Sequence, residues 1–163
     1  MQVILIRHAE AVDESLALRD PHRHLTQVGR RQAHDLGDRL RWHDCTPTHV
    51  WSSPLVRAVQ TAEVVLGRYE PEIIARISVE IVMALAPGSE HGERVLVAAL
   101  GKLPASSTVY LVGHEPSISA IGAVLGRNPS FAALTKGQAV RIDDGRVRWR
   151  FAHDAEAPVL ETQ

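Results

Sequence analysis

Residues 48–66 read THVWSSPLVRAVQTAEVVL and combine a short apolar run, a serine–proline turn and an amphipathic segment. The run over 48–51 is typical of a strand, whereas Ser53 and Pro54 are residue types that favour the start of a helix. Apolar residues then recur at helical spacing on one face: Leu55, Ala58, Val59, Ala62 and Leu66. This stretch predicts a strand, an N-cap at Ser53 and a helix that packs against a sheet.

The same alternation extends in both directions along the chain. Residues 3–6 read as a buried strand, and Thr26 caps a helix that places Leu36 and Leu40 on one face. Further elements are predicted towards the C-terminus: a strand over 77–82, a helix over 93–103, a strand over 108–112, a helix over 118–125 and a hairpin of 140–142 with 147–151. The alternation predicts an α/β fold and a single domain over residues 1–163, with a polar tail from about residue 152.

Composition fits an ordinary globular domain and excludes several classes of function. The chain has 163 residues, of which 45% are hydrophobic and 23% charged, and its formal net charge is -1. This balance excludes nucleic-acid binding through bulk positive charge, and no apolar run approaches the roughly 20 residues of a membrane span. The chain opens on the strand-like MQVILI and holds one cysteine, Cys45. We therefore expect no signal peptide, a cytoplasmic location and a monomer without nucleic-acid or membrane partners.

Residues suited to phosphate chemistry follow three of the predicted strands. Arg7 and His8 directly follow the first strand. Arg57 follows the second near the start of its helix, and His114 follows the third. If the three strands are neighbours, these side chains meet beyond the carboxyl edge of the sheet, where ligands of α/β proteins bind. Such a pocket favours a compact dianion, phosphate or sulfate, because arginine offers a planar fork of donors to its oxygens. One neutral histidine would attack phosphorus, while the other would stabilise charge on oxygen.

Other chemistries that handle phosphate or hydrolysis fail on the same sequence. A cysteine phosphatase loop needs an arginine six positions after its cysteine, but Trp51 stands six positions after Cys45. The G-x-x-x-x-G-K-[ST], G-x-G-x-x-G and G-x-S-x-G motifs are all missing from the sequence. His22 and His24 are typical of a solvated loop next to Arg19 and Arg23, and a positive pocket opposes a divalent cation. We expect neither a metal nor another cofactor.

Four segments of the chain resemble the histidine phosphatase superfamily, also called the phosphoglycerate mutase-like family. Their order and spacing match that family from residue 3 to about residue 125. The segment over 52–62 is the most specific of them, whereas Arg-His alone would be a weak signal. The segments are Arg7-His8-Ala9, LTQVGRRQA over 25–33, SSPLVRAVQTA over 52–62 and GHEP over 113–116.

The resemblance implies a three-layer α/β/α sandwich with a mostly parallel central sheet, and phosphatase chemistry that needs no metal. It implies that His8 is the nucleophile and forms a transient phosphohistidine. It also implies that Arg7 and Arg57 clamp the phosphoryl oxygens and that His114 completes the pocket. Two neighbouring residues are expected to support the pocket from behind: Ser53 and Glu115.

Two departures from the family pattern point to a subgroup. Ala9 stands where many members have glycine, and SixA-type phosphohistidine phosphatases commonly read Arg-His-Ala at this point. Many members also carry an acid that protonates the leaving oxygen, but the comparable stretch over 82–88 has no carboxylate. Glu90 is the nearest candidate for a general acid. An imidazole leaves more readily than an alkoxide without a proton donor, so the pattern favours phosphohistidine as substrate.

The short middle of the chain favours a substrate carried by a protein. Only about fifty residues separate Thr61 from His114, which leaves little chain for a lid over a small substrate. A histidine phosphotransfer domain is the partner that the resemblance suggests. Two alternatives remain: a small-molecule phosphomonoesterase that uses Glu90, and a non-catalytic module that binds a phospholigand. Residues 126–138 either border the pocket or merely connect elements, and the sequence does not decide between these roles.

Overall fold

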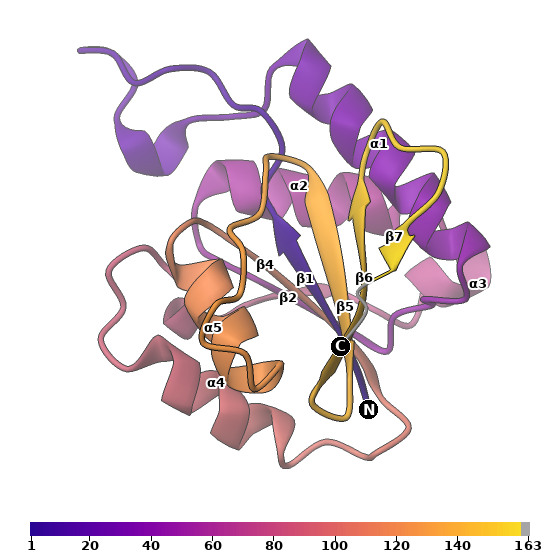
Figure 1. The fold of residues 1–163 in the computed structure, drawn as a ribbon. Coiled ribbons are helices and arrows are strands. Elements are labelled where there is room, and N and C mark those ends of the chain that lie inside the picture. Colours follow the sequence, from indigo (N-terminus) through magenta and orange to yellow (C-terminus); the bar gives the residue numbers. More distant parts are fainter. Residues whose placement is uncertain (161–163) are drawn as a thin grey trace.

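The computed structural model describes residues 1–160, which form a seven-stranded sheet in the order β3-β2-β4-β1-β5-β6-β7 (Figure 1). Strands β1 to β4 run parallel to one another, whereas β5, β6 and β7 continue the sheet in antiparallel fashion. The strands are β1 Gln2–Arg7, β2 His49–Ser52, β3 Val79–Ile81, β4 Thr108–Gly113, β5 Gln138–Asp143, β6 Arg146–Ala152 and β7 Val159–Leu160. The three strands that carry the predicted site, β2, β4 and β1, are therefore direct neighbours.

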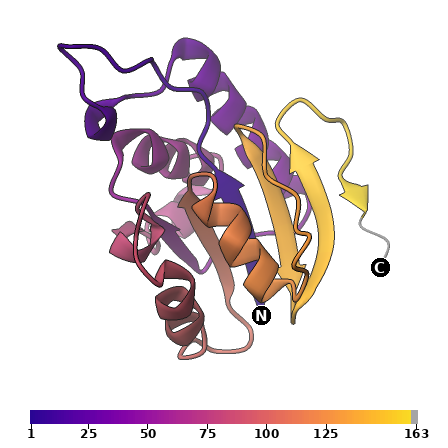
Figure 2. The ribbon, with the colours of Figure 1, turned by 60° about the vertical axis from the view of Figure 1, so that its left-hand side comes forward.

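Helices cover both faces of the sheet and create two separate cores (Figure 2). Ile4 and Ile6 of β1 point into the core beneath α1 and α2, whereas Val3 and Leu5 point into the core beneath α4 and α5. The helices are α1 Gln27–Trp42, α2 Val56–Leu66, α3 Pro71–Ile74, α4 Gly92–Leu100 and α5 Ser117–Leu125, with 3-10 turns η1 Asp20–His22 and η2 Met83–Leu85. Because successive residues of β1 point into one core or the other, the strand is apolar on both faces and its apolar run is continuous. The α/β class and the three layers are confirmed.

The start of α2 differs from its predicted start. Leu55 is the N-cap residue of α2, without a side-chain capping bond, so the predicted cap at Ser53 is wrong. The Ser53 hydroxyl instead lies 2.8 Å from Nε2 of His114. Thr26 does cap α1, because its side chain accepts a hydrogen bond from the amide of Gly29. The Ser53 hydroxyl therefore binds a residue that is distant in sequence, His114, instead of capping α2.

The C-terminal part of the sheet also departs from the prediction. The hairpin between β5 and β6 is confirmed, and its turn residues Asp144 and Gly145 both have positive φ angles, 50° and 83°. The polar tail is wrong for Val159 and Leu160, which pair with the free edge of β6 as β7. Residues 161–163 of that predicted tail lie outside the described residues.

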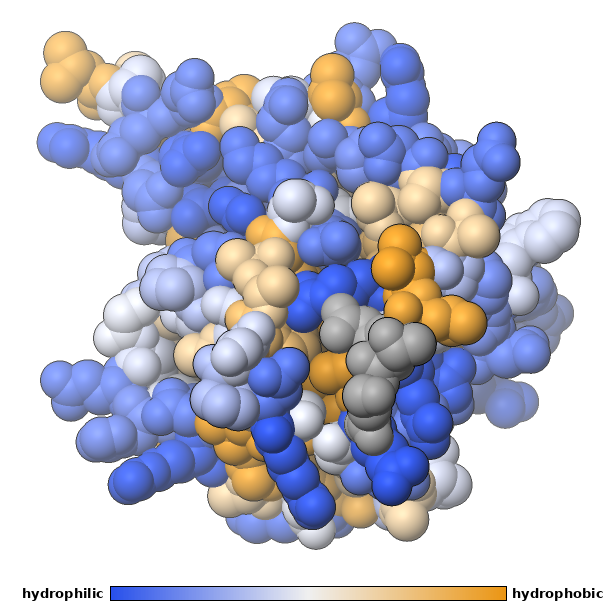
Figure 3. All heavy atoms as spheres, viewed as in Figure 1, coloured by the Kyte–Doolittle hydropathy of each residue, from blue (hydrophilic) through white to orange (hydrophobic). Residues whose placement is uncertain are grey.

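One face of the molecule is largely polar. Figure 3 shows hydrophilic residues over most of one face, with the hydrophobic residues in small separate patches. Between residues 1 and 160, no helix combines the length and the apolar character needed to cross a bilayer.

Candidate active site

The carboxyl ends of three parallel strands bring the predicted histidines together. The register pairs Arg7 with Gly113 across β1 and β4, so His8 and His114 leave the sheet side by side. Their ring centroids are 4.9 Å apart at an interplanar angle of 51°. His8 is 7% exposed and His114 3% exposed. The structure therefore builds a buried pair of imidazoles at the edge where the sequence placed them.

His8 holds one ring nitrogen ready to react. Its Nδ1 lies 2.7 Å from the carbonyl oxygen of Ala9, and only a protonated Nδ1 can donate to that acceptor. In the neutral ring this leaves the lone pair on Nε2, which lies 3.3 Å from Nε of Arg57. The backbone bond thus selects the tautomer, and Nε2 is the atom that can attack phosphorus.

Arg57, which is 6% exposed, links His8 to a residue that the sequence analysis missed. Its Nε donates towards Nε2 of His8, while its two terminal nitrogens contact Asp20 in η1. NH1 donates to the Asp20 carbonyl oxygen at 2.9 Å and lies 3.2 Å from Oδ1, and NH2 donates to Oδ2 at 3.3 Å. No local pattern around Asp20 signals this contact, because 37 residues separate the two partners.

Arg7 reaches the loop between α5 and β5. Its NH1 donates to the carbonyl oxygen of Leu134 at 2.7 Å, and the amide of Leu134 donates to Oε1 of Glu115 at 2.7 Å. The amide of Gly137 contacts the carbonyl oxygens of Arg7 and His8 at 3.2 and 3.3 Å. The stretch over 126–138 therefore borders the site, and Glu115 supports that loop.

Two buried nitrogen atoms at the site have no hydrogen-bond partner within the described chain: Nε of Arg7 and Nδ1 of His114. Nε2 of His114 is already engaged with the Ser53 hydroxyl. Native proteins seldom leave buried polar atoms unsatisfied, because each one costs desolvation free energy. Both atoms fit a pocket whose remaining partner is an anionic ligand.

The two longest motifs hold the loop after β1 in place. The amide of Ala9 donates to the hydroxyl of Thr61 at 3.1 Å, and that hydroxyl donates to the carbonyl oxygen of Arg57 at 2.7 Å. At Gly29, an added Cβ would lie 1.9 Å from the carbonyl oxygen of Glu10. Glycine is therefore required there, because α1 passes directly against the loop that carries His8.

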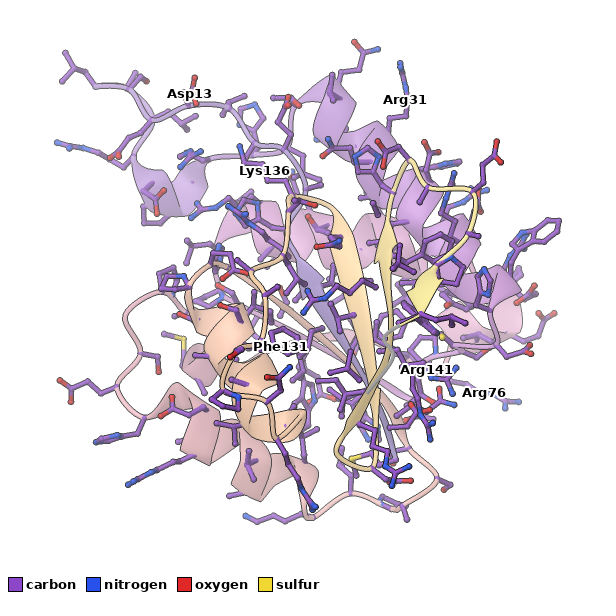
Figure 4. All side chains as sticks on the ribbon, in the orientation of Figure 1. Asp13, Arg31, Arg76, Phe131, Lys136 and Arg141 are labelled. Atoms are coloured by element: carbon purple, nitrogen blue, oxygen red, sulfur yellow. The ribbon has the colours of Figure 1, made fainter. Side chains whose placement is uncertain are left out.

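Burial keeps both imidazoles neutral. Desolvation by burial is the main cause that lowers the pKa of His8 to about 4, and Arg57, Arg7 and Lys136 lower it further. The backbone bond to Ala9 acts in the opposite direction. Burial likewise lowers the pKa of His114 to about 3, with added effects of its neighbours. Lys136 lies at this same end of the sheet (Figure 4).

Acid should therefore destabilise the protein through these two histidines. In the unfolded chain each imidazole takes up a proton near its ordinary pKa of 6.5, but in the fold only near pH 4 for His8 and pH 3 for His114. Unfolding thus takes up protons in this window, so stability falls as the pH falls through it. Urea unfolding at pH 7 and 4.5 should show a loss of about 2 kcal/mol for each histidine. Between these two pH values a His114→Asn variant should lose less unfolding free energy than the wild type. An equal loss would contradict the assignment of this pH dependence to His114.

Glu90 is not brought to the site by any contact. It is exposed in the turn before α4 and makes no hydrogen bond or ion pair with Arg7, His8, Arg57 or His114 in the described structure. The predicted set of Arg7, His8, Arg57 and His114 does converge. Ser53 contacts His114, whereas Glu115 contacts the amide of Leu134 in the loop that Arg7 reaches.

The N-terminal part of the chain matches known phosphatases in sequence. The model of the histidine phosphatase superfamily, branch 1, matches residues 3–80. Over 75 residues the chain is 43% identical to the 5''-phosphoribostamycin phosphatase of Niallia circulans, a match that covers 42% of this chain and 35% of that protein. The chain thus spans about a third of the length of this curated relative.

Solved structures share the fold over nearly the whole chain. The protein histidine phosphatase SixA in complex with tungstate superimposes with a TM-score of 0.80 at 23% identity, covering 94% of this chain and 97% of that one. A mycobacterial glucosyl-3-phosphoglycerate phosphatase superimposes with a TM-score of 0.62 at 18% identity, covering 91% and 96%. Residues 3–80 thus match the histidine phosphatase superfamily, and the solved structures show the same fold over nearly the whole chain.

Proposed function

We propose that this protein is a metal-independent phosphatase in which His8 accepts the phosphoryl group, and that its substrate is phosphohistidine on a protein. The observation that carries the proposal is the buried His8, whose Nδ1 is tied to Ala9 while its Nε2 faces Arg57. A neutral imidazole in this tautomer is a nucleophile, and the adjacent guanidinium groups bind the oxygens of its target.

The proposed reaction has two steps. Nε2 of His8 attacks phosphorus, the bond from phosphorus to the substrate nitrogen breaks, and the electron pair stays on the leaving imidazole. Water then attacks the phosphorylated His8, which releases inorganic phosphate and restores the free ring. Arg7, Arg57 and His114 stabilise the negative charge on the phosphoryl oxygens in both steps.

Two observations favour phosphohistidine over a phosphate ester. No carboxylic acid with a raised pKa contacts the four site residues in the described chain, whereas an alkoxide needs such a donor to leave. Leu16 is 98% exposed on the segment between β1 and η1 that leads to Asp20. This side chain is available for contact with a partner protein, for which a phosphotransfer domain in the cytoplasm is our candidate.

A small-molecule phosphomonoesterase is the second candidate. It is favoured by the 43% identity to a relative whose name describes a phosphatase of a phosphorylated small molecule. In that case Glu90 would have to move towards the leaving oxygen and act as general acid. A non-catalytic module would bind phosphate without turnover.

Hydrolysis of a phosphohistidine peptide should be compared with that of para-nitrophenyl phosphate and common sugar phosphates, all with a chelator present. The proposal expects the highest kcat/KM on the phosphohistidine peptide and no effect of the chelator. Preference for a sugar phosphate, together with a loss of about 10²-fold in Glu90→Gln, would favour the ester reading. Glu93→Gln, a change in the adjacent helix α4, serves as the matched control. If the protein binds phosphate but turns over none of these substrates, it is the non-catalytic module that binds a phospholigand.

A further inference from the structure

Asp20 is fixed between two guanidinium groups at the edge of the site. Besides its contacts with Arg57, its Oδ1 accepts a hydrogen bond from NH1 of Arg23 at 2.9 Å. Arg23 is itself held, because its Nε donates to the carbonyl oxygen of Val12 at 2.6 Å. The side chain of Asp20 remains 40% exposed. A carboxylate thus stands at a defined place beside the pocket while still open to an incoming group.

The contacts of Arg57 place this carboxylate on the far side from His8. A guanidinium group has five N–H donors in one plane, which allows it to hold two acidic groups at once. The Nε of Arg57 points towards Nε2 of His8, whereas its terminal nitrogens point towards Asp20. A phosphoryl group attacked by His8 can therefore bind on the Nε side without displacing Asp20. In an in-line displacement the leaving atom departs from the side of phosphorus opposite His8.

Asp20 carries its negative charge at neutral pH. Partial burial raises the pKa of its carboxyl group, but hydrogen bonds from Arg23 and Arg57 and their positive charges outweigh burial, and the resulting pKa is below the ordinary value. Such a group cannot supply a proton to an alkoxide at neutral pH. It is a strong acceptor for a cationic N–H donor, because hydrogen bonds to charged groups are the stronger ones.

Resting on the proposed function of this site, we propose that Asp20 determines substrate specificity by accepting a hydrogen bond from the protonated imidazole of phosphohistidine. In that substrate one ring nitrogen carries phosphorus and the other carries a proton. When His8 attacks, the phosphorus–nitrogen bond breaks, the electron pair stays on the ring nitrogen, and a neutral imidazole leaves with its N–H facing Asp20. Phosphate esters have no cationic donor at this point, so Asp20 favours phosphohistidine over them.

The test is Asp20→Asn, measured on two substrates with the full chain. On a phosphohistidine peptide kcat/KM should fall about 10-fold to 100-fold, as expected when a charge-assisted hydrogen bond is lost. On para-nitrophenyl phosphate, whose leaving group carries no cationic donor, kcat/KM should fall by a clearly smaller factor, and thermal unfolding checks that the variant is folded. Asp13→Asn is the matched control, because Figure 4 shows Asp13 on the projecting loop away from the sheet. It should leave both activities unchanged.

Each other result overturns the proposal. An equal loss on both substrates would mean that Asp20 only orients Arg57, and no loss on either would mean that it has no part in recognition. An absence of phosphohistidine activity in the wild type, with hydrolysis of para-nitrophenyl phosphate intact, would overturn the proposed substrate itself. Failure of the proposed substrate is therefore seen with the wild-type protein, whereas failure of the role of Asp20 is seen only with the Asp20→Asn variant. The pH profile adds a second readout, since the fall of kcat/KM as the substrate imidazole loses its proton should be weaker in Asp20→Asn.

Discussion

Replacing His8 by alanine should abolish turnover on every phosphorylated substrate while the protein stays folded. The loss in kcat should be about 10⁴-fold or more, because removal of a nucleophile leaves only the binding groups of the site. His8 is buried, and alanine removes its ring together with the bond from Nδ1 to the carbonyl oxygen of Ala9. Other backbone bonds stay in place, such as that between the amide of Ala9 and Thr61. Initial rates on para-nitrophenyl phosphate and thermal unfolding measure the two halves of this prediction.

A labelling experiment separates covalent catalysis from simple binding. Wild-type protein mixed with a ³²P-labelled substrate and quenched in alkali should retain label, and the His8→Ala protein should retain none. His34→Ala is a suitable control, because His34 is half-exposed on α1 and pairs with Asp35 and Asp38. It should be labelled like the wild type. Full turnover in the His8→Ala protein would end the covalent-histidine mechanism.

Arg57→Ala should weaken the binding of inorganic phosphate by about 10²-fold to 10³-fold. Arg57 is nearly fully buried, and its Nε reaches the reactive nitrogen of His8, so alanine removes a charged donor next to the atom that would attack phosphorus. Loss of a charge-assisted contact of this kind costs about 3 kcal/mol. Isothermal titration with phosphate and product inhibition by phosphate both measure the effect.

Two further variants show whether the arginine fork itself matters. Arg57→Lys keeps the positive charge but lacks the planar pair of donors, so it should recover only part of the lost affinity. Arg68→Ala removes an arginine that pairs with Asp38 at the surface, and it should bind phosphate like the wild type. Phosphate affinity that is unchanged in Arg57→Ala would contradict the assignment of this residue.

Much of the architecture could be predicted from local patterns. The apolar run over 3–6 and the serine–proline turn at 53–54 predicted strands and helices because burial and capping depend on neighbours in sequence. The predicted N-cap at Ser53 was wrong because local patterns do not include distant partners. The Ser53 hydroxyl is bound by His114, 61 positions away. Val159 and Leu160 were predicted to belong to a polar tail. They pair with the edge of β6, and local sequence patterns do not show where a sheet edge is free.

The residue types of the candidate site could be predicted from sequence alone, because they follow strands whose parallel order sends their carboxyl ends to one edge. The strand ends predict that Arg7, His8, Arg57 and His114 meet, and the structure brings the four together. Which ring nitrogen of His8 is free depends on the folded chain, since a backbone carbonyl selects the tautomer. The tertiary structure also decided that Asp20 faces Arg57 and that the loop over 126–138 borders the pocket, because long-range contacts across the fold create both neighbourhoods.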